Sequence, residues 1–297
     1  MSFIYLTGNM LDWASILLCA AIGFSICRAA GLFNMGIEGQ MYAGGFASAA
    51  CFPFFSAFLP EGPVFTVLGA AAAAAGAGAL LGFLCGFLKK ICGANELITT
   101  FLLSAAVFPV IGYLIGGPFR GVEGSLLATA KLPDSVRFAR ILPPSNLNVS
   151  VFASIVLLFC CRFFVNETAP GYRMRLCAEA GAFAAYAGIG GGGARKNYWL
   201  YALSFSGALA GLAGFFAVYG SAGLCHQGFT GGVGWAAITT SLIARGKFAA
   251  LVPAALFYSL LKFSADAALL GLGESSYFFT FVTGCALFFS ARESRAK

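Results

Sequence analysis

Long runs without a charged residue constrain this chain more than any other feature. Residues 39–60, 62–88 and 97–119 contain no Asp, Glu, Lys or Arg. Each run is at least as long as the roughly 20 residues that a helix needs to cross a bilayer. Residues 197–244 are uncharged apart from any protonated His226, and hold two more such segments. Because these runs are continuous and do not alternate over about ten residues, they predict transmembrane helices and argue against a β-barrel.

The composition excludes a soluble domain. Of the 297 residues, 60% are hydrophobic and 10% are charged, and the mean hydropathy is +0.87. The net charge of +7 raises the question of nucleic acid. No basic stripe interleaved with aromatic residues supports such a partner, so we assign the excess charge to cytoplasmic loops. The first ten residues contain no Lys or Arg, so the charged leader of a signal peptide is missing and the first segment is expected to stay as an anchor.

The sequence predicts an all-α polytopic membrane protein with eight to nine transmembrane helices, some broken at glycine-rich turns. Segments seven and nine are short for a full crossing. Residues 1–297 are expected to form a single transmembrane domain. Charge bias and parity place the N-terminus outside, a polar connection at 119–148 outside and a basic connection at 166–196 in the cytoplasm. The nine segments are about 12–30, 38–59, 64–88, 96–118, 149–165, 198–219, 233–244, 248–270 and 276–290.

A glycine-punctuated turn at residues 31–40, GLFNMGIEGQ, separates the first two segments. It carries Asn34, Gly36, Glu38 and Gly39. Protein or water must shelter the backbone and the carboxylate here, because uncovered polar groups are costly in hydrocarbon. We therefore predict a hinge near the cytoplasmic side with exposure to a pathway, in which Glu38 braces the second helix or gates the inner half.

Other polar residues within the apolar sequence have two interpretations each. Asn95 and Glu96 either cap the fourth helix or line a pathway. His226, in a second glycine-rich stretch, either meets solute or a partner at the outer mouth or hydrogen-bonds neighbouring backbone. Lys262 and Asp266 are four residues apart and are expected to pair on one helical face. Ser104 is a candidate for the pathway.

Small residues recur every three to four positions in two segments, at Gly78, Gly82 and Gly86 and at Gly207, Gly211 and Gly214. This spacing predicts helix faces that pack closely. The ten cysteines lie mostly in apolar stretches and are interpreted as small buried hydrophobes. No metal spacing, phosphate loop or nucleophile–base pair is present, so we expect no cofactor, no metal and no enzymatic activity. The glycines at 190–193 lack the features of a phosphate cradle.

The basic connection contains the sharpest local pattern. Arg173 and Arg175 precede an alanine-rich helical stretch at 176–186, and Ala187-Gly188 is a helix stop. A basic amphipathic stretch of this kind could simply lie on anionic headgroups. However, the order of Gly171, Arg173, Arg175, Glu179, Ala184, Ala185 and Gly188 resembles the coupling loop of bacterial ABC-importer permeases of the branched-chain amino acid, simple sugar and nucleoside group.

Three more blocks, at 31–41, 93–104 and 231–246, resemble the same family and occur in its order, most closely in its nucleoside-type branch with the spirochaete riboflavin permeases. The resemblance implies a subunit of the bacterial inner membrane without its own ATPase site. It also implies three protein partners: a cytoplasmic ABC ATPase, a second permease subunit and an extracytoplasmic solute-binding lipoprotein. Membrane lipid is the remaining partner. The implied solute is a nucleoside or a riboflavin-like ring.

Several positions depart from the family pattern. Ala180-Gly181 stand where the family commonly has Asn-Pro, and Ser104 stands where Asn is usual. We expect docking of the ATPase to survive the first change, whereas the second alters the polarity of the pathway. Two other functions stay open: a permease for a simple sugar or branched-chain amino acid, and a secondary transporter coupled to an ion through Glu38, Glu96 or Asp266.

Overall fold

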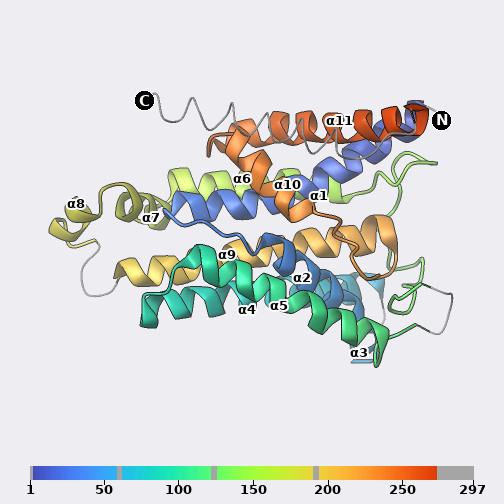
Figure 1. Ribbon diagram of the computed structural model, residues 1–297, viewed down its shortest axis with the longest axis horizontal. Helices are drawn as coiled ribbons and strands as arrows, with labels where there is room; N and C mark the ends of the chain where they lie inside the picture. The colour runs from blue at the N-terminus through green and yellow to red at the C-terminus, as the bar shows by residue number, and fades with distance from the viewer. Residues whose placement is uncertain (1–2, 59–61, 122–125, 190–193, 273–297) are drawn as a thin grey trace.

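The computed structural model describes residues 3–58, 62–121, 126–189 and 194–272, and these ranges fold into helices joined by short connections (Figure 1). Two isolated antiparallel bridges, Ala128 with His226 and Arg140 with Asn148, are the extended pairings within them. The elements are α1 (Phe3–Ala29), α2 (Ile37–Ala50), α3 (Phe52–Phe58), α4 (Pro63–Cys92), α5 (Glu96–Gly116), α6 (Ser150–Glu167), α7 (Ala169–Glu179), α8 (Gly181–Tyr186), α9 (Ala194–Phe216), the π-helix η1 (Ala217–Ala222), α10 (Val233–Ile243) and α11 (Phe248–Leu272).

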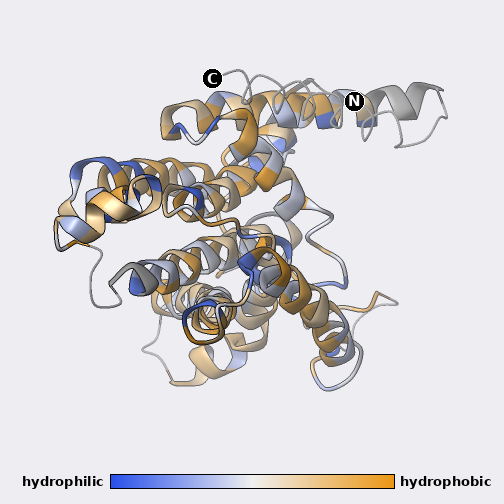
Figure 2. Ribbon diagram, turned by 60° about the vertical axis from the view of Figure 1, so that its left-hand side comes forward, coloured by the Kyte–Doolittle hydropathy of each residue, from blue (hydrophilic) through white to orange (hydrophobic). Residues whose placement is uncertain are grey.

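Among the described residues, six helices are long and apolar enough to cross a membrane, and the bent pair α2–α3 raises the count to seven. Hydrophobic residues run along most of the length of these helices (Figure 2). The prediction of helical membrane spans is confirmed, but the count of eight to nine is not. The predicted seventh segment is α10, which has only 11 residues. The predicted ninth segment, at 276–290, lies outside the described residues.

Helix α1 begins nine residues earlier than the sequence predicted. Asp12 looked like a helix start, yet it lies inside the helix and is only 4% exposed. Its Oδ1 accepts a hydrogen bond of 2.7 Å from Asn148 Nδ2 in the connection before α6. A buried acid with a donor partner can occupy a helix interior, so the acid did not mark the boundary.

The tightest helix packing involves α4 and α9, which make the most extensive contact in the molecule. A Cβ at Gly78 would meet the carbonyl oxygen of Gly207, and one at Gly82 would meet that of Leu203. A Cβ at Gly44 of α2 would meet the backbone of Gly211, which also lies close to Ala74 of α4. The predicted small-residue faces are therefore confirmed, and they hold α4, α9 and α2 in one layer of close backbone contact.

The short helices α7 and α8 protrude at one end of the bundle, and the N-terminus of α1 lies at the other (Figure 1). The end that carries α7 also gathers basic residues. Gly31, just after α1, lies against Ala178 of α7, and Lys90 Nζ donates to Asn197 Oδ1 at 2.8 Å. Arg28 lies beside Gly246 in the α10–α11 turn. This collection of positive charge is typical of a cytoplasmic end.

Candidate translocation pathway and coupling region

The turn between α1 and α2 starts at the end of the bundle that carries α7, where Gly31 lies against Ala178, and leads to the start of α2 near the middle of the bundle. The chain leaves α1 through Gly31, whose φ of 71° is in the left-handed region, and runs extended to α2. Asn34 is fully buried, and its Nδ2 donates to Ser206 Oγ of α9 at 3.0 Å. Since Ser206 is the tenth residue of the span 197–222, α2 begins roughly halfway along its neighbour α9.

The side chain of Asn34 is saturated by local partners. Its Nδ2 also donates to Gln40 Oε1 at 2.8 Å, and its Oδ1 accepts from the Gly36 N–H at 2.9 Å. These bonds fix the turn against both α2 and α9. Asn34 is therefore a structural anchor of the turn in this conformation, with no polar atom left over for a solute.

Glu38 joins α2 to α10 across the molecule. It lies in the first turn of α2 and is 5% exposed. Its Oε1 accepts from the Gly232 N–H at 2.9 Å, and its Oε2 accepts from the Gly234 N–H. These donors belong to the N-terminus of α10, where the helix dipole favours a negative charge. The geometry favours the bracing role of Glu38 over direct exposure to a pathway.

Helix α5 closes the other side of this junction. Ser104 Oγ accepts from the Gly39 N–H at 2.9 Å, and Thr100 Oγ1 accepts from the Met35 N–H at 3.1 Å. The structure thus brings together Asn34, Gly36, Glu38, Gly39 and Ser104 in one buried polar junction. Sequence reasoning missed Thr100, Gln40 and Ser206. Thr100 and Ser104 lie one helical turn apart on an apolar helix, and this spacing could have indicated that both hydroxyls face the same junction.

Asn95 and Glu96 lie elsewhere, at the junction of α4 and α5. Asn95 is the N-cap of α5, and its Oδ1 accepts from the Leu97 N–H at 2.9 Å. Glu96 pairs with Lys89 at 2.6 Å, and Lys89 also lies 4.8 Å from the centre of the Trp199 ring. The capping interpretation of Asn95 is confirmed, and Glu96 is an ion-pair partner at the same helix end.

His226 belongs to the connection between η1 and α10, which lies against the connection before α6. Its Nδ1 lies 3.1 Å from the Gln227 carbonyl oxygen, and its backbone bridges Ala128. This is the backbone-bonded arrangement that the sequence allowed. Next to it, Tyr42 stacks between Phe108 and Phe229, with ring centroids 5.0 and 5.5 Å away.

Lys262 and Asp266 pair at 2.9 Å on α11, as the sequence predicted.

Cys19, Cys27, Cys85 and Cys161 are buried, in agreement with their interpretation as small hydrophobes, whereas Cys160 is exposed. Burial also raises the pKa of the Cys225 thiol to about 12, which keeps it protonated at neutral pH. Among the described residues no group of His, Cys, Asp and Glu is arranged to hold a metal. Cys285 and the glycines at 190–193 lie outside them.

The basic connection after α6 forms a helical hairpin. Contrary to prediction, Arg173 and Arg175 lie inside a helix, because Thr168 and Pro170 start α7 upstream of them. Thr168 Oγ1 accepts from the Gly171 N–H at 3.3 Å, and Gly171 packs on the backbone of Phe164 and Val165. Helix α7 ends at Glu179, and Ala180 separates it from α8.

The two arginines of α7 point to different environments. Arg173 is exposed, whereas Arg175 is half-buried and its Nη2 donates to the Asn166 carbonyl oxygen at 3.4 Å. In α8, Ala184 is fully buried and Ala185 is exposed. Helix α8 ends at Tyr186, and Gly188 two residues later has a φ of 72°. Its aromatic side chains project outward, with Phe183 58% and Tyr186 92% exposed. This hairpin therefore exposes two aromatic side chains at the basic end of the bundle.

A bundle of apolar helices with a buried polar junction and a helical hairpin at its basic end defines a membrane transport subunit. The family model described as the permease component of the branched-chain amino acid transport system matches residues 6–291, and the chain belongs to this family. It is the permease component of an ABC importer and a multi-pass protein of the cytoplasmic (inner) membrane.

Three curated relatives show the range of this family. The chain is 36% identical to the probable riboflavin import permease protein RfuC of Treponema pallidum over 87% of this chain and 67% of the relative. It is 26% identical to the glucose ABC transporter permease protein TsgB13 of Haloferax volcanii, over 82% and 65%. It is 25% identical to the nucleoside ABC transporter permease protein NupB of Lactococcus lactis, over 87% and 71%. No solved structure matches the chain.

Proposed function

We propose that this chain carries riboflavin, or a closely related flat ring with a polyol, through the membrane, as half of a pair of permease subunits. The 36% identity to a riboflavin import permease, against 25–26% to the glucose and nucleoside permeases, carries the proposal. An extracytoplasmic binding lipoprotein would deliver the solute. Cytoplasmic ATPase subunits would supply the energy, since the chain has no ATPase site of its own.

The exposed rings beside the polar junction suit such a solute. Phe101 of α5 and Trp235 of α10 are 43% and 40% exposed, and their ring centroids are 6.2 Å apart. Phe101 follows Thr100, and Trp235 follows Gly234, so both rings adjoin the buried junction around Glu38. Aromatic rings of this kind stack on a flat heterocycle, and nearby hydroxyls can bind a polyol. We place the pathway along this face, between two permease subunits.

The short helices fit a broken-helix architecture. Helix α2 and helix α10 both begin at the junction and run to opposite ends, as half-helices in transporters do. If α10 with its preceding connection and the segment at 276–290 both cross, the total reaches the proposed eight to nine spans in one domain of residues 1–297. The turns at residues 31–36 and 223–232 would be the glycine-rich breaks.

The hairpin of α7 and α8 is our candidate for the ATPase contact. Arg173, Phe183 and Tyr186 are exposed there, and Gly171 seats α7 on the end of α6. Arg175 connects α7 to the end of α6 through the Asn166 carbonyl oxygen, and Glu179 is the last residue of α7. Large exposed aromatic side chains are frequent hot spots of protein–protein interfaces. Closure of the ATPase pair would move this hairpin and switch the access of the pathway.

Ion-coupled transport is the competing mechanism, and the contacts of the carboxylates argue against it. Glu38 accepts two backbone hydrogen bonds, Glu96 pairs with Lys89 and Asp266 pairs with Lys262. Each candidate carboxylate is therefore already neutralised or hydrogen-bonded. A coupling site would need one of these groups to exchange its partner for an ion.

Uptake by the reconstituted importer tests the proposal. Proteoliposomes with the full complex should take up riboflavin when ATP is supplied, and an ionophore should not abolish the uptake. Guanosine and glucose should not compete with riboflavin at equal concentration. Competition by guanosine or glucose, or uptake without ATP that an ionophore abolishes, would contradict the proposal.

The double variant Phe183→Ala with Tyr186→Ala tests the coupling role in the same assay. Loss of two exposed anchors should weaken ATPase binding by about 30-fold or more and reduce uptake accordingly. Phe257→Ala on α11, where Phe257 is 49% exposed, is the matched control and should leave uptake unchanged. Charge reversal at both Arg173 and Arg175 should likewise uncouple uptake from ATP hydrolysis. Unchanged uptake in these hairpin variants would exclude the coupling assignment.

A further inference from the structure

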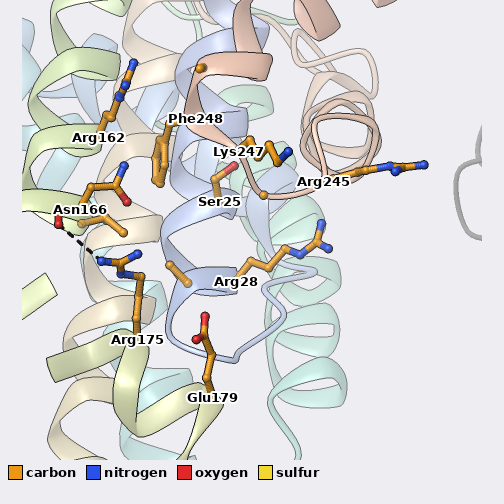
Figure 3. A pocket seen from close by; sticks show the side chains of 13 residues that line it. Ser25, Arg28, Arg162, Asn166, Arg175, Glu179, Arg245, Lys247 and Phe248 are labelled. Carbon is orange, nitrogen blue, oxygen red and sulfur yellow. Dashed lines mark hydrogen bonds between the residues drawn. The ribbon is translucent and has the colours of Figure 1, made fainter. Parts of the chain in front are cut away.

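A basic cavity lies at the cytoplasmic end of α1, beside the hairpin but distinct from its exposed face (Figure 3). Its volume is about 500 Å³. It is enclosed by α1, α6, α7 and the turn between α10 and α11. The charged residues that line it are Arg28, Arg162, Arg175, Arg245, Lys247 and Glu179. The positive charges around this cavity repel one another, and the single carboxylate offsets only one of them, so an added anion would be stabilised there.

Two of the basic side chains have guanidinium nitrogens that are not matched by an acceptor. Arg28 Nη1 and Arg175 Nε are buried and have no hydrogen-bond partner. Within the described part of the chain, neither Arg28 nor Glu179 forms an ion pair. Figure 3 shows Arg28 and Arg175 on opposite sides of the cavity with Glu179 between their ends, whereas Arg245 extends away from the group. A buried guanidinium nitrogen without an acceptor is costly, so the cavity favours a ligand with oxygen acceptors.

Two of the helices that line the cavity also expose apolar side chains farther along the membrane span. On α6, Phe159 and Phe152 lie on the same helical face as Arg162 and are 61% and 59% exposed. On α11, Leu256 and Leu260 share the face of the lining residue Ala249 and are 37% and 55% exposed. Both helices pack on α1. A ligand bound to the basic residues therefore has room for apolar chains that extend along the membrane span.

We propose that this cavity binds the phosphate headgroup of an anionic phospholipid from the cytoplasmic leaflet. Arg28, Arg175 and Lys247 hold the phosphate oxygens, Arg162 adds a further positive charge to the cavity, and the acyl chains lie against α6 and α11. Basic pockets between transmembrane helices on the cytoplasmic side suit such headgroups. A free phosphate ion would satisfy the same cations but would make no use of the apolar faces. The site is independent of the transported solute and ties the lipid to α7, which carries Arg175.

Lipid binding to the full transporter complex tests this site. We would titrate the detergent-purified complex with dioleoylphosphatidylglycerol or dioleoylphosphatidylcholine and count bound lipids by native mass spectrometry. The phosphatidylglycerol adduct should be favoured by at least tenfold, and inorganic phosphate at the same concentration should not displace it. Equal binding of both lipids would overturn the proposal. Displacement by inorganic phosphate would show a site for the free ion and would overturn the lipid assignment.

Variants assign the binding to this cavity. Removal of one cation should weaken phosphatidylglycerol binding about fivefold, and this is the effect expected of Arg28→Gln. The double variant Arg162→Gln with Lys247→Gln removes two cations and should weaken binding about 25-fold. The latter two residues are exposed, so their loss should leave the fold intact. Lys131→Gln with Arg140→Gln, exposed at the opposite end, is the matched control and should have no effect. Unchanged binding in the Arg162 and Lys247 double variant would overturn the proposal.

Discussion

Buried polar side chains in this protein join helices to one another through hydrogen bonds. Asn34 and Glu38 together connect the turn after α1 to α2, α9 and α10. In a membrane span every polar atom needs a partner, because no water replaces a lost hydrogen bond. The same argument explains why Asp12 is tolerated inside α1, where Asn148 supplies a donor.

Replacement of Glu38 measures how much its hydrogen bonds contribute to the stability of the protein. Glu38→Ala leaves the N–H groups of Gly232 and Gly234 without acceptors, at about 1–3 kcal/mol each. Glu38→Gln keeps one acceptor and should lose about half as much stability. Thermal unfolding of the purified chain in detergent would measure both losses. Asp266→Asn, which breaks a half-exposed ion pair, is the control and should cost no more than about 1 kcal/mol. Equal stability of Glu38→Ala and this control would contradict a stabilising role for the hydrogen bonds between Glu38 and α10.

At the scale of elements, small residues decide which helices touch. The backbones of α4 and α9 approach so closely at Gly78 and Gly207 that neither position has room for a Cβ. Helix α2 approaches α9 in the same way at Gly44, where a Cβ would meet the backbone of Gly211. Such packing gains dispersion contacts along the whole interface, because there is little hydrophobic driving force between helices in lipid.

Two glycines of α4 provide a matched pair for testing this contact. A Cβ at Gly76 meets no atom within 4 Å, whereas one at Gly78 would collide with the Gly207 carbonyl. Gly76→Ala should be neutral or more stable by up to about 1 kcal/mol, since alanine favours the helix. Gly78→Ala should lose about 1–3 kcal/mol through overpacking. Thermal unfolding in detergent distinguishes them, and equal midpoints would show that the contact does not limit the packing.

At the scale of the whole molecule, the two ends of the bundle differ in charge and in shape. The hairpin of α7 and α8 and the basic cavity share one end, and the connection before α6 lies at the other (Figure 1). We expect the first end to face the cytoplasm, because basic residues concentrate there. This orientation also puts the proposed ATPase contact and the lipid headgroup on the same side.

Labelling with a membrane-impermeant maleimide checks this orientation. In a background with the exposed Cys92 and Cys160 changed to serine, Lys131→Cys should react in intact cells whose outer barrier is permeable. Tyr186→Cys, at a position that is 92% exposed, should react only after the inner membrane is opened. Labelling of Tyr186→Cys in intact cells would reverse the topology and remove the ATPase contact.

The family blocks were readable from the sequence, and so were most helix bounds. Uncharged runs predicted α4 and α5, and long apolar segments predicted α6 and α11, each to within a few residues, because hydrocarbon accepts only long apolar helices. Glycine spacing predicted closely packing faces on α4 and α9 but not that these two faces meet, and capping by Asn95 was one of two predicted roles. The sequence predicted the short segment that forms α10, but it could not show that α10 is hydrogen-bonded to Glu38, since the partners are 194 and 196 residues apart.

The sequence by itself determined the class of protein, because membrane helices and the coupling pattern are written in local composition and spacing. Only the tertiary structure decided which polar side chains are hydrogen-bonded to other parts of the chain and which are exposed. It placed Glu38 on the N-terminus of α10 and turned Arg175 inward while Arg173 stayed exposed. It also gathered Arg28, Arg162 and Lys247 from three parts of the chain around one cavity. Such arrangements depend on how helices distant in sequence pack, which no local pattern specifies.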